Sequence, residues 1–214
     1  DKSIKITSLM RDMYLQIPGY SDNRINAAYL WGGMNLLDQT IEKNFKIQID
    51  GNVEVDFEGF MDGIDIIGGV PIVITKAEAS HLNDQGFNLS AGEVNMNGEL
   101  ALAYARIRQI GNDHGRTERQ RKVIVSAFEK MKGSSVPDIM ALANKVFPCI
   151  TTDLSNDQLI NLGITGLTSN LSTIEQHRIP LDGKYKDAKV RKMQVLIPDL
   201  EANRQELHKI IYGE

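Results

Sequence analysis

The sequence predicts an α/β fold, with a mixed central β-sheet covered by helices on both faces. Stretches that alternate apolar and polar residues, as strands do, are interleaved with stretches whose apolar residues recur every three or four positions, as in helices. In addition, 214 residues with 42% hydrophobic content are enough to bury one sizeable core. No internal repeat or interdomain linker is recognisable, so we expect a single domain over residues 1–214.

In the first half, alternation indicates strands, and glycine pairs mark the ends or breaks of helices. Ile4 and Ile6 alternate with polar residues, which predicts a strand that ends just before Arg11 and Asp12. The elements predicted in this half are a strand at 4–9, a helix at 22–45 interrupted at Gly32-Gly33, a strand at 53–57, a helix at 60–67 and a strand at 70–74. Segment 77–97 is predicted to be irregular, and segment 98–108 stays open between helix, hinge and strand.

Helical periodicity dominates the second half. The proline of Pro198-Asp199 fits the first turn of a last helix, whose inner face carries Leu200 and Leu207. The elements predicted in this half are helices at 116–131, 136–147 and 156–162, a strand at 190–197, and the last helix after Pro198.

Composition excludes several classes of protein. The net charge of −4 and the pI of about 5.6 argue against general nucleic-acid binding, which usually needs a basic face. One cysteine, Cys149, excludes an internal disulfide framework without deciding the compartment. No apolar run reaches the length of a membrane span, and the first residues lack signal-peptide character. Because the chain opens almost directly into a strand pattern, we expect native sequence upstream of it.

The feature most informative about function is a local basic cluster in this acidic chain. Residues 104–122 contain five arginines and one lysine against one aspartate and one glutamate. Arginine carries a permanently charged, forked guanidinium group that matches phosphate oxygens. The cluster therefore indicates recognition of phosphate or pyrophosphate.

The helical phase directs part of this cluster inward. At 100° per residue, Arg116, Arg119 and Gln120 share a side of their helix with Val123, whereas Lys122 takes the opposite side. Inward arginines need an anionic partner, and a helix N-terminus also favours bound phosphate. If residues 104–108 are extended, Arg106 and Arg108 share one face and converge on the same place.

Other interpretations of these residues stay open. The arginines can instead form surface salt bridges with some of the acidic residues, and Arg121 and Lys122 are assigned to solvent. Arg11-Asp12 taken alone is a turn ion pair. Asp113 can orient an arginine, cap the helix, act as a base or bind a metal, and capping is the simplest of these roles.

The order of motifs resembles the LytR-CpsA-Psr family of bacterial cell-envelope proteins. The matching motifs are Ser8-Leu-Met-Arg-Asp12, Ile17-Pro-Gly19, Arg24-Ile-Asn-Ala-Ala-Tyr29 with Gly32-Gly33, Val55-Asp-Phe-Glu-Gly-Phe60, Gly68-Gly-Val70, Asn97-Gly-Glu-Leu-Ala-Leu-Ala-Tyr-Ala-Arg-Ile-Arg108 and Asn112-Asp-His-Gly-Arg-Thr-Glu-Arg-Gln120. They cover about residues 3 to 131. Met10 departs from the pattern, which usually has proline there. The resemblance implies that the family's first strand and N-terminal membrane anchor, with an acidic segment that supplies magnesium-binding aspartates, are expected upstream of this sequence.

The resemblance implies an extracytoplasmic phosphotransferase on the bacterial cell membrane, of Gram-positive type. It would move a teichoic acid or capsular polysaccharide from a polyprenyl-pyrophosphate carrier to peptidoglycan, with pyrophosphatase as a side activity. Members are anchored by an N-terminal membrane helix. By motif, the pyrophosphate would be held by Arg11, Arg106, Arg108, Arg116 and Gln120, with Arg119 in support, and the catalytic residues would be Arg11, Asp113 and Arg116. The lipid tail would occupy a hydrophobic tunnel.

The resemblance also implies Mg²⁺, or Mn²⁺, as cofactor. Its ligands are expected upstream of this chain, and Asp12 is a candidate within it. Two other functions compete with transfer: non-catalytic binding of polyprenyl phosphate or wall polymer, and envelope-linked transcriptional attenuation. The acidic charge and the lack of a recognisable helix-turn-helix argue against direct DNA contact.

Overall fold

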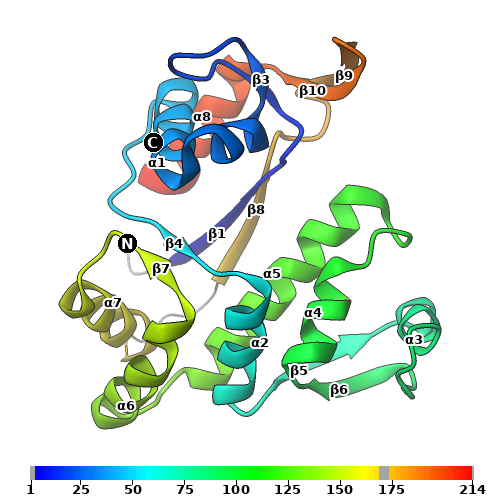
Figure 1. Cartoon of the computed structure of the whole chain (residues 1–214), viewed down its shortest axis with the longest axis vertical. Coiled ribbons are helices and arrows are strands. Elements are labelled where there is room, and N and C mark those ends of the chain that lie inside the picture. The colour runs from blue at the N-terminus through cyan, green and yellow to red at the C-terminus, as the bar shows by residue number, and fades with distance from the viewer. Residues whose placement is uncertain (1–2, 169–173, 214) are drawn as a thin grey trace. The chain divides into compact units, whose positions relative to one another are not determined.

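The computed structural model describes residues 3–168 and 174–213, and it confirms the α/β class (Figure 1). Within these ranges, short strands and helices alternate along the chain, and the strands pair as five two-stranded sheets. The strands β2, β3, β4 and β7 have two residues each, too few to carry a ladder on to another neighbour. Among the described residues, strand pairs stand in place of the expected central sheet, and one isolated parallel bridge links Met13, beside β2, to Leu196 of β10.

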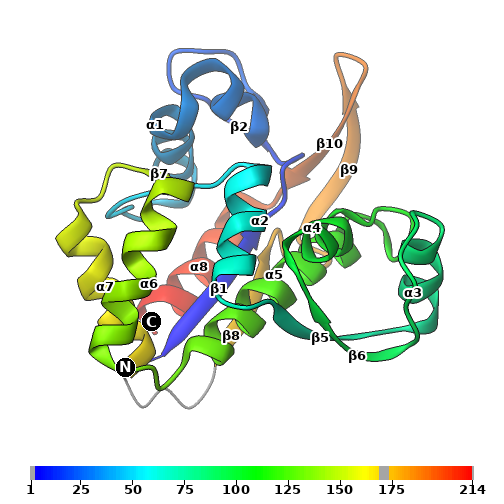
Figure 2. The ribbon, with the colours of Figure 1, turned by 60° about the horizontal axis from the view of Figure 1, so that its bottom comes forward.

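Contacts along the chain define two compact units, which can be followed by residue number in Figure 2. Unit 1 consists of Asp1–Ile4 and Val53–Ile174, and unit 2 of Lys5–Asn52 and Glu175–Glu214. Among the residues that the structure covers, no helix is both long and apolar enough to cross a bilayer.

Unit 1 holds the whole basic cluster of residues 104–122. Its elements are β4 (Val53–Glu54), α2 (Phe57–Ile66), β5 (Val70–Ile74), α3 (Lys76–Asn83), β6 (Gly92–Met96), α4 (Gly98–Arg106), α5 (Asn112–Met131), α6 (Val136–Val146), one 3₁₀ turn (Phe147–Cys149), β7 (Thr151–Thr152) and α7 (Asn156–Thr168). β5 and β6 pair antiparallel, and the buried side chains of β5 pack with those of α3, α4 and α5. This core fixes the three helices that carry or brace the arginines.

The start of α4 is set by a close approach to α2. A Cβ atom on Gly98 would lie 2.2 Å from the carbonyl oxygen of Met61, so only glycine fits there. The Gly98 N–H donates to Asp65 at 2.7 Å, and the Asn97 side chain caps the helix by accepting from Leu100 N–H. These contacts fix the axis of α4 and hence the position of Arg106 at its end.

Unit 2 carries Arg11 and Asp12. Its elements are β1 (Ile4–Leu9), β2 (Tyr14–Leu15), β3 (Asn23–Arg24), α1 (Ile25–Phe45), β8 (Ile174–Ile179), β9 (Tyr185–Val190), β10 (Met193–Pro198) and α8 (Leu200–Tyr212). Its core includes Met13, Phe45, Ile179 and Leu207. The predicted break in α1 is confirmed, because Gly32 and Gly33 have non-helical backbone angles.

Several predicted boundaries are wrong. Segment 77–97 is not irregular, because it contains most of α3 as well as β6. The strand expected at 53–57 stops at Glu54, since the Asp56 side chain accepts from Gly59 N–H at 2.8 Å and starts α2. The late strand expected at 190–197 is β10, which starts only at Met193, because Arg191-Lys192 forms the turn of its hairpin with β9.

Candidate functional site

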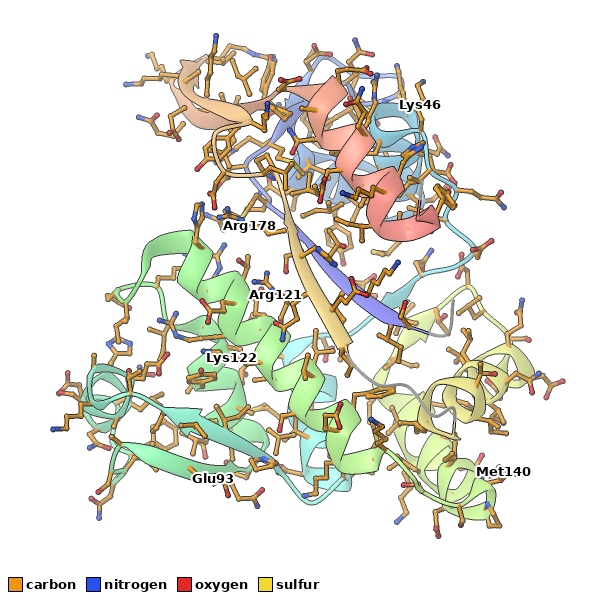
Figure 3. The ribbon with its side chains drawn as sticks, turned by 180° about the vertical axis from the view of Figure 1, so that it is seen from behind. Lys46, Glu93, Arg121, Lys122, Met140 and Arg178 are labelled. Carbon is orange, nitrogen blue, oxygen red and sulfur yellow. The ribbon has the colours of Figure 1, made fainter. Side chains whose placement is uncertain are left out.

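Helix α5 buries two of its arginines. It begins at Asn112, about one turn earlier than predicted, after Gly111 with φ of 74°. Arg116 and Arg119 are only 8% and 4% exposed, which confirms that both face inward. Lys122 is exposed and pairs with Glu118 at 2.9 Å, as expected of the outer face (Figure 3). Gln120 shares the sector of Arg116 but is exposed, so the prediction of an inward Gln120 is wrong.

Arg119 is bound to the protein itself. Its Nε donates to Glu78 Oε1 at 2.8 Å, its Nη1 to the carbonyl oxygen of Ile107 at 3.2 Å, and its Nη2 to that of Ile110 at 2.6 Å. One guanidinium thus ties α5 to α3 and to the segment between α4 and α5. This geometry favours the supporting role of Arg119 over direct contact with a pyrophosphate.

We call the contacts of Arg119 with Glu78 and the two carbonyl groups the brace. Glu78 contributes to the brace from α3. Its Oε2 accepts from the backbone N–H and the hydroxyl of Thr75, which forms a capping box at the start of the helix. Burial alone raises the pKa of this carboxyl group. The backbone N–H of Thr75, the Arg119 guanidinium and the Thr75 hydroxyl together outweigh burial, so the pKa lies below its ordinary value of 4.5. Glu78 is therefore ionised at neutral pH.

The lowered pKa of Glu78 predicts a loss of stability in acid. A group whose pKa is lower in the folded state stabilises the fold above its unfolded pKa, here about 4.5, and this contribution disappears as the pH falls through the folded pKa. Replacing Glu78 by glutamine should therefore cost stability at neutral pH, and the difference from wild type should shrink well below pH 4.5. Urea unfolding of both proteins, at neutral pH and well below pH 4.5, measures the difference in the free energy of unfolding. A difference that does not depend on pH would contradict the prediction.

Arg106 and Arg108 flank the end of α4. Residues 104–106 are helical, so the two arginines do not share the face of an extended strand. Ile107 between them is buried, whereas both arginines are exposed. The Arg106 guanidinium lies 4.5 Å from the ring centroid of Phe57, in a cation–π contact that fixes one of its faces. Its N–H groups lie in the plane of the guanidinium.

In unit 2, Arg11 shares a carboxylate with an arginine that sequence reasoning missed. Asp12 accepts from Arg11 Nε at 3.4 Å and from Arg24 Nη1 at 3.2 Å. Backbone hydrogen bonds hold this turn in place, from Met10 N–H to the carbonyl oxygen of Ile179 and from Ile25 N–H to that of Met13. The turn ion pair is confirmed, and Arg24 extends it. Only the position of Arg24 inside a matched motif could have suggested this role.

A metal ion does not fit the described side chains. Both carboxylate oxygens of Asp12 accept from guanidinium groups, which leaves Asp12 in the role of orienting arginines. Within residues 3–168 and 174–213, no three His, Cys, Asp or Glu side chains are placed to hold a metal ion. The backbone of Asp113 lies in the first turn of α5, but its side chain lies outside the described part of the chain. Mg²⁺ or Mn²⁺ stays a prediction.

Unit 1 also contains an apolar cavity of about 400 Å³, which sequence reasoning did not locate. Its walls come from the segment before α2 and from α2, α5, α6 and α7. They consist of Val53, Val55, Gly59, Phe60, Gly63, Ile64, Ile67, Ala127, Met131, Ile139, Leu142, Ala143, Val146, Phe147, Ile150, Leu159, Ile160, Gly163 and Leu167. In the sequence these residues look like ordinary core, because an apolar wall and an apolar core have the same periodicity. An apolar cavity of this size suits a hydrocarbon chain.

Comparison with known proteins identifies the family. The family model described as the LytR_cpsA_psr family matches residues 1–209. The chain belongs to this family. The resemblance noted in the motifs is thereby confirmed, and the match extends well beyond them.

Relatives in this family carry two kinds of name. The chain is 34% identical over 186 residues to the polyisoprenyl-teichoic acid–peptidoglycan teichoic acid transferase TagU of Oceanobacillus iheyensis, covering 82% of this chain and 57% of that protein. It is 31% identical to the regulatory protein MsrR of Staphylococcus aureus, covering 87% and 58%. The chain thus spans somewhat more than half the length of these relatives. The crystal structure of Bacillus subtilis TagV matches with a TM-score of 0.78 and 28% identity, over 98% of this chain and 84% of that one.

Proposed function

We propose that this chain is the catalytic part of a phosphotransferase on the outer face of a bacterial cell membrane, of Gram-positive type. It would move a teichoic acid or capsular polysaccharide from a polyprenyl-pyrophosphate carrier to peptidoglycan. The observation that carries the proposal is that one helix, α5, bears a buried arginine and also forms part of the wall of the apolar cavity. The name of the TagU relative supports the same reaction.

The two ends of α5 suit the two ends of a lipid pyrophosphate. Arg116 lies one turn into the helix, and Ala127 and Met131 line the cavity further along. At 1.5 Å per residue, Arg116 and Ala127 are about 16 Å apart along the axis. A lipid pyrophosphate joins a charged head group to an apolar tail. It therefore requires a cationic site followed by an apolar site, as along α5. Neither a soluble phosphate nor a simple hydrocarbon uses both.

The arginines would bind and stabilise the reacting phosphates. In the transfer step, the acceptor hydroxyl oxygen forms a bond to the phosphorus that carries the polymer, and the phosphoanhydride bond to the lipid-bearing phosphate breaks. The lipid leaves as polyprenyl phosphate, and the hydroxyl proton passes to a base or to water. Such transfer depends mainly on positioning and on stabilising charge that develops on oxygen, which guanidinium groups supply. The roles of Arg11 in unit 2 and of Asp113 stay predictions.

The proposal is tested by a transfer assay with the whole chain, lipid-linked polymer and peptidoglycan. Formation of a polymer–peptidoglycan bond with release of polyprenyl phosphate supports it. Tight binding of the lipid without turnover would indicate the non-catalytic receptor instead. The name of the MsrR relative suggests a regulatory function as the alternative. Sequence-specific DNA binding at physiological salt would support transcriptional regulation.

Filling the apolar cavity should exclude the lipid tail selectively. Leu142 of α6 lines the cavity, whereas Met140 of the same helix is exposed (Figure 3). We expect Leu142→Trp to weaken binding of a long polyprenyl pyrophosphate by about tenfold or more, since each buried CH₂ contributes about 0.8 kcal/mol. Binding of inorganic pyrophosphate should not change. Met140→Trp is the matched control, and equal losses in both variants would show that the cavity does not hold the tail.

A further inference from the structure

A second cavity in unit 1, of about 620 Å³, runs beside the exposed face of α4. α4 lines it with Glu99, Leu102 and Arg106, and His81 of α3 and Gln85 in the turn after α3 border it. Arg106 is a candidate pyrophosphate ligand, so the cavity begins at an expected phosphate site. We call this cavity the α4 groove.

The α4 groove is long enough for more than one sugar ring. Glu99 and Arg106 lie seven residues apart on the same face of α4, which corresponds to about 10 Å along the helix. The volume of the groove lies within the range of ordinary ligand sites. An elongated ligand can therefore lie along α4 with one end at Arg106.

The lining of the groove suits hydroxyl and amide groups better than phosphates. The Glu99 carboxylate, the His81 imidazole and the carboxamides of Gln85 and Gln109 can each accept hydrogen bonds. The imidazole and the carboxamides can also donate them. Phe87 and Leu102 add an apolar surface against which the C–H face of a sugar or an acetamido methyl group can pack. Glu99 at the far end would repel a polyanionic polymer. The groove thus favours a neutral saccharide.

The brace fixes one wall of the groove. His81 follows Glu78 by one turn of α3, and Glu78 is held by Arg119 of α5. Gln109 lies in the segment between α4 and α5 whose carbonyl groups accept from Arg119. A pre-organised wall lowers the entropy lost when a flexible ligand is ordered.

We propose that the α4 groove binds the acceptor of the reaction, a neutral N-acetylated glycan chain, with its reactive hydroxyl at the Arg106 end. The proposal rests on the proposed function for its chemistry, because the hydroxyl at that end would face the phosphorus to be attacked. The donor takes the apolar cavity and the arginines, and the acceptor approaches along α4.

The test is direct binding of a tetramer of N-acetylglucosamine to the whole chain, followed by saturation-transfer NMR and calorimetry. Glu99→Ala and Leu102→Trp should each weaken binding by about tenfold, through a lost hydrogen bond or a filled groove. Glu93→Ala, an exposed carboxylate on β6, is the matched control and should bind normally (Figure 3). Binding of polyprenyl pyrophosphate should not change in any of the three.

Normal tetramer binding in both groove variants would overturn the proposal, as would equal loss of lipid-pyrophosphate binding. Binding of a glycerol phosphate polymer at the groove, in place of the neutral tetramer, would also overturn it. Failure of the proposed function is a separate result. Tetramer binding that depends on Glu99, in a chain that transfers no polymer, supports the groove and contradicts the phosphotransferase.

Discussion

Replacing Arg116 by alanine should weaken the binding of polyprenyl pyrophosphate about 100-fold and reduce transfer at least as much. The residue is 8% exposed, so a bound phosphate would meet its guanidinium group with little competing water. Hydrogen bonds to charged groups contribute about 1.5–3 kcal/mol each. Loss of one or two of them corresponds to a factor of about 100, because 1.4 kcal/mol is tenfold. Calorimetry with the lipid measures this change.

Two further variants show whether the effect belongs to the site. Lys122→Ala removes an exposed cation from the same helix and should leave binding within about twofold, because surface pairs contribute little. Arg116→Lys keeps the charge but removes the planar fork, so it should bind between wild type and Arg116→Ala. Unchanged binding by a folded Arg116→Ala protein would contradict the assignment of Arg116 as a phosphate ligand.

Breaking the brace should destabilise unit 1 more than any surface substitution. Arg119→Ala removes three donated hydrogen bonds and leaves the Glu78 carboxylate buried without its cation. Removing one partner of a buried ion pair costs about 3–5 kcal/mol. Denaturant unfolding followed by circular dichroism measures this loss.

The matched pair for this experiment lies on the outer face of α5. Glu118 and Lys122 form an exposed ion pair, and Glu118→Gln should change the free energy of unfolding by less than about 0.5 kcal/mol. The double variant Glu78→Gln, Arg119→Ala should cost less than the sum of the single variants, because the same pair is broken only once. Full additivity would show that the two side chains do not act together.

The sequence predicted what depends on local periodicity. The inward phase of Arg116 and Arg119 follows from 100° per residue, which needs no knowledge of the rest of the chain. The sequence could not show that Arg119 binds Glu78 and two carbonyl groups. Glu78 is far from Arg119 in the sequence, and a backbone carbonyl group has no sequence signature. The motif match gave Arg119 a supporting role, and its hydrogen bonds within the protein agree with that role.

Tertiary contacts explain the remaining differences. α3 was missed although Thr75 and Glu78 have the local spacing of a capping box, whereas β6 is defined by its pairing with β5. The Asp12–Arg24 pair joins residues on either side of a loop, with no periodic pattern between them. The apolar cavity and the α4 groove are spaces between helices, and no spacing of residues along a single helix reveals a space.

In the proposed function, helix α5 would determine which kinds of pyrophosphate the protein binds. A nucleotide-activated sugar carries the same pyrophosphate as a lipid-linked one, but a polar nucleoside stands in place of the hydrocarbon tail. On a rigid helix, Ala127 and Met131 keep a fixed spacing from Arg116, so that nucleoside would have to enter the apolar cavity and give up its hydration. In the proposed function, selectivity for lipid-linked over nucleotide-linked precursors would then depend on the fixed spacing between the arginine and the apolar residues of one helix.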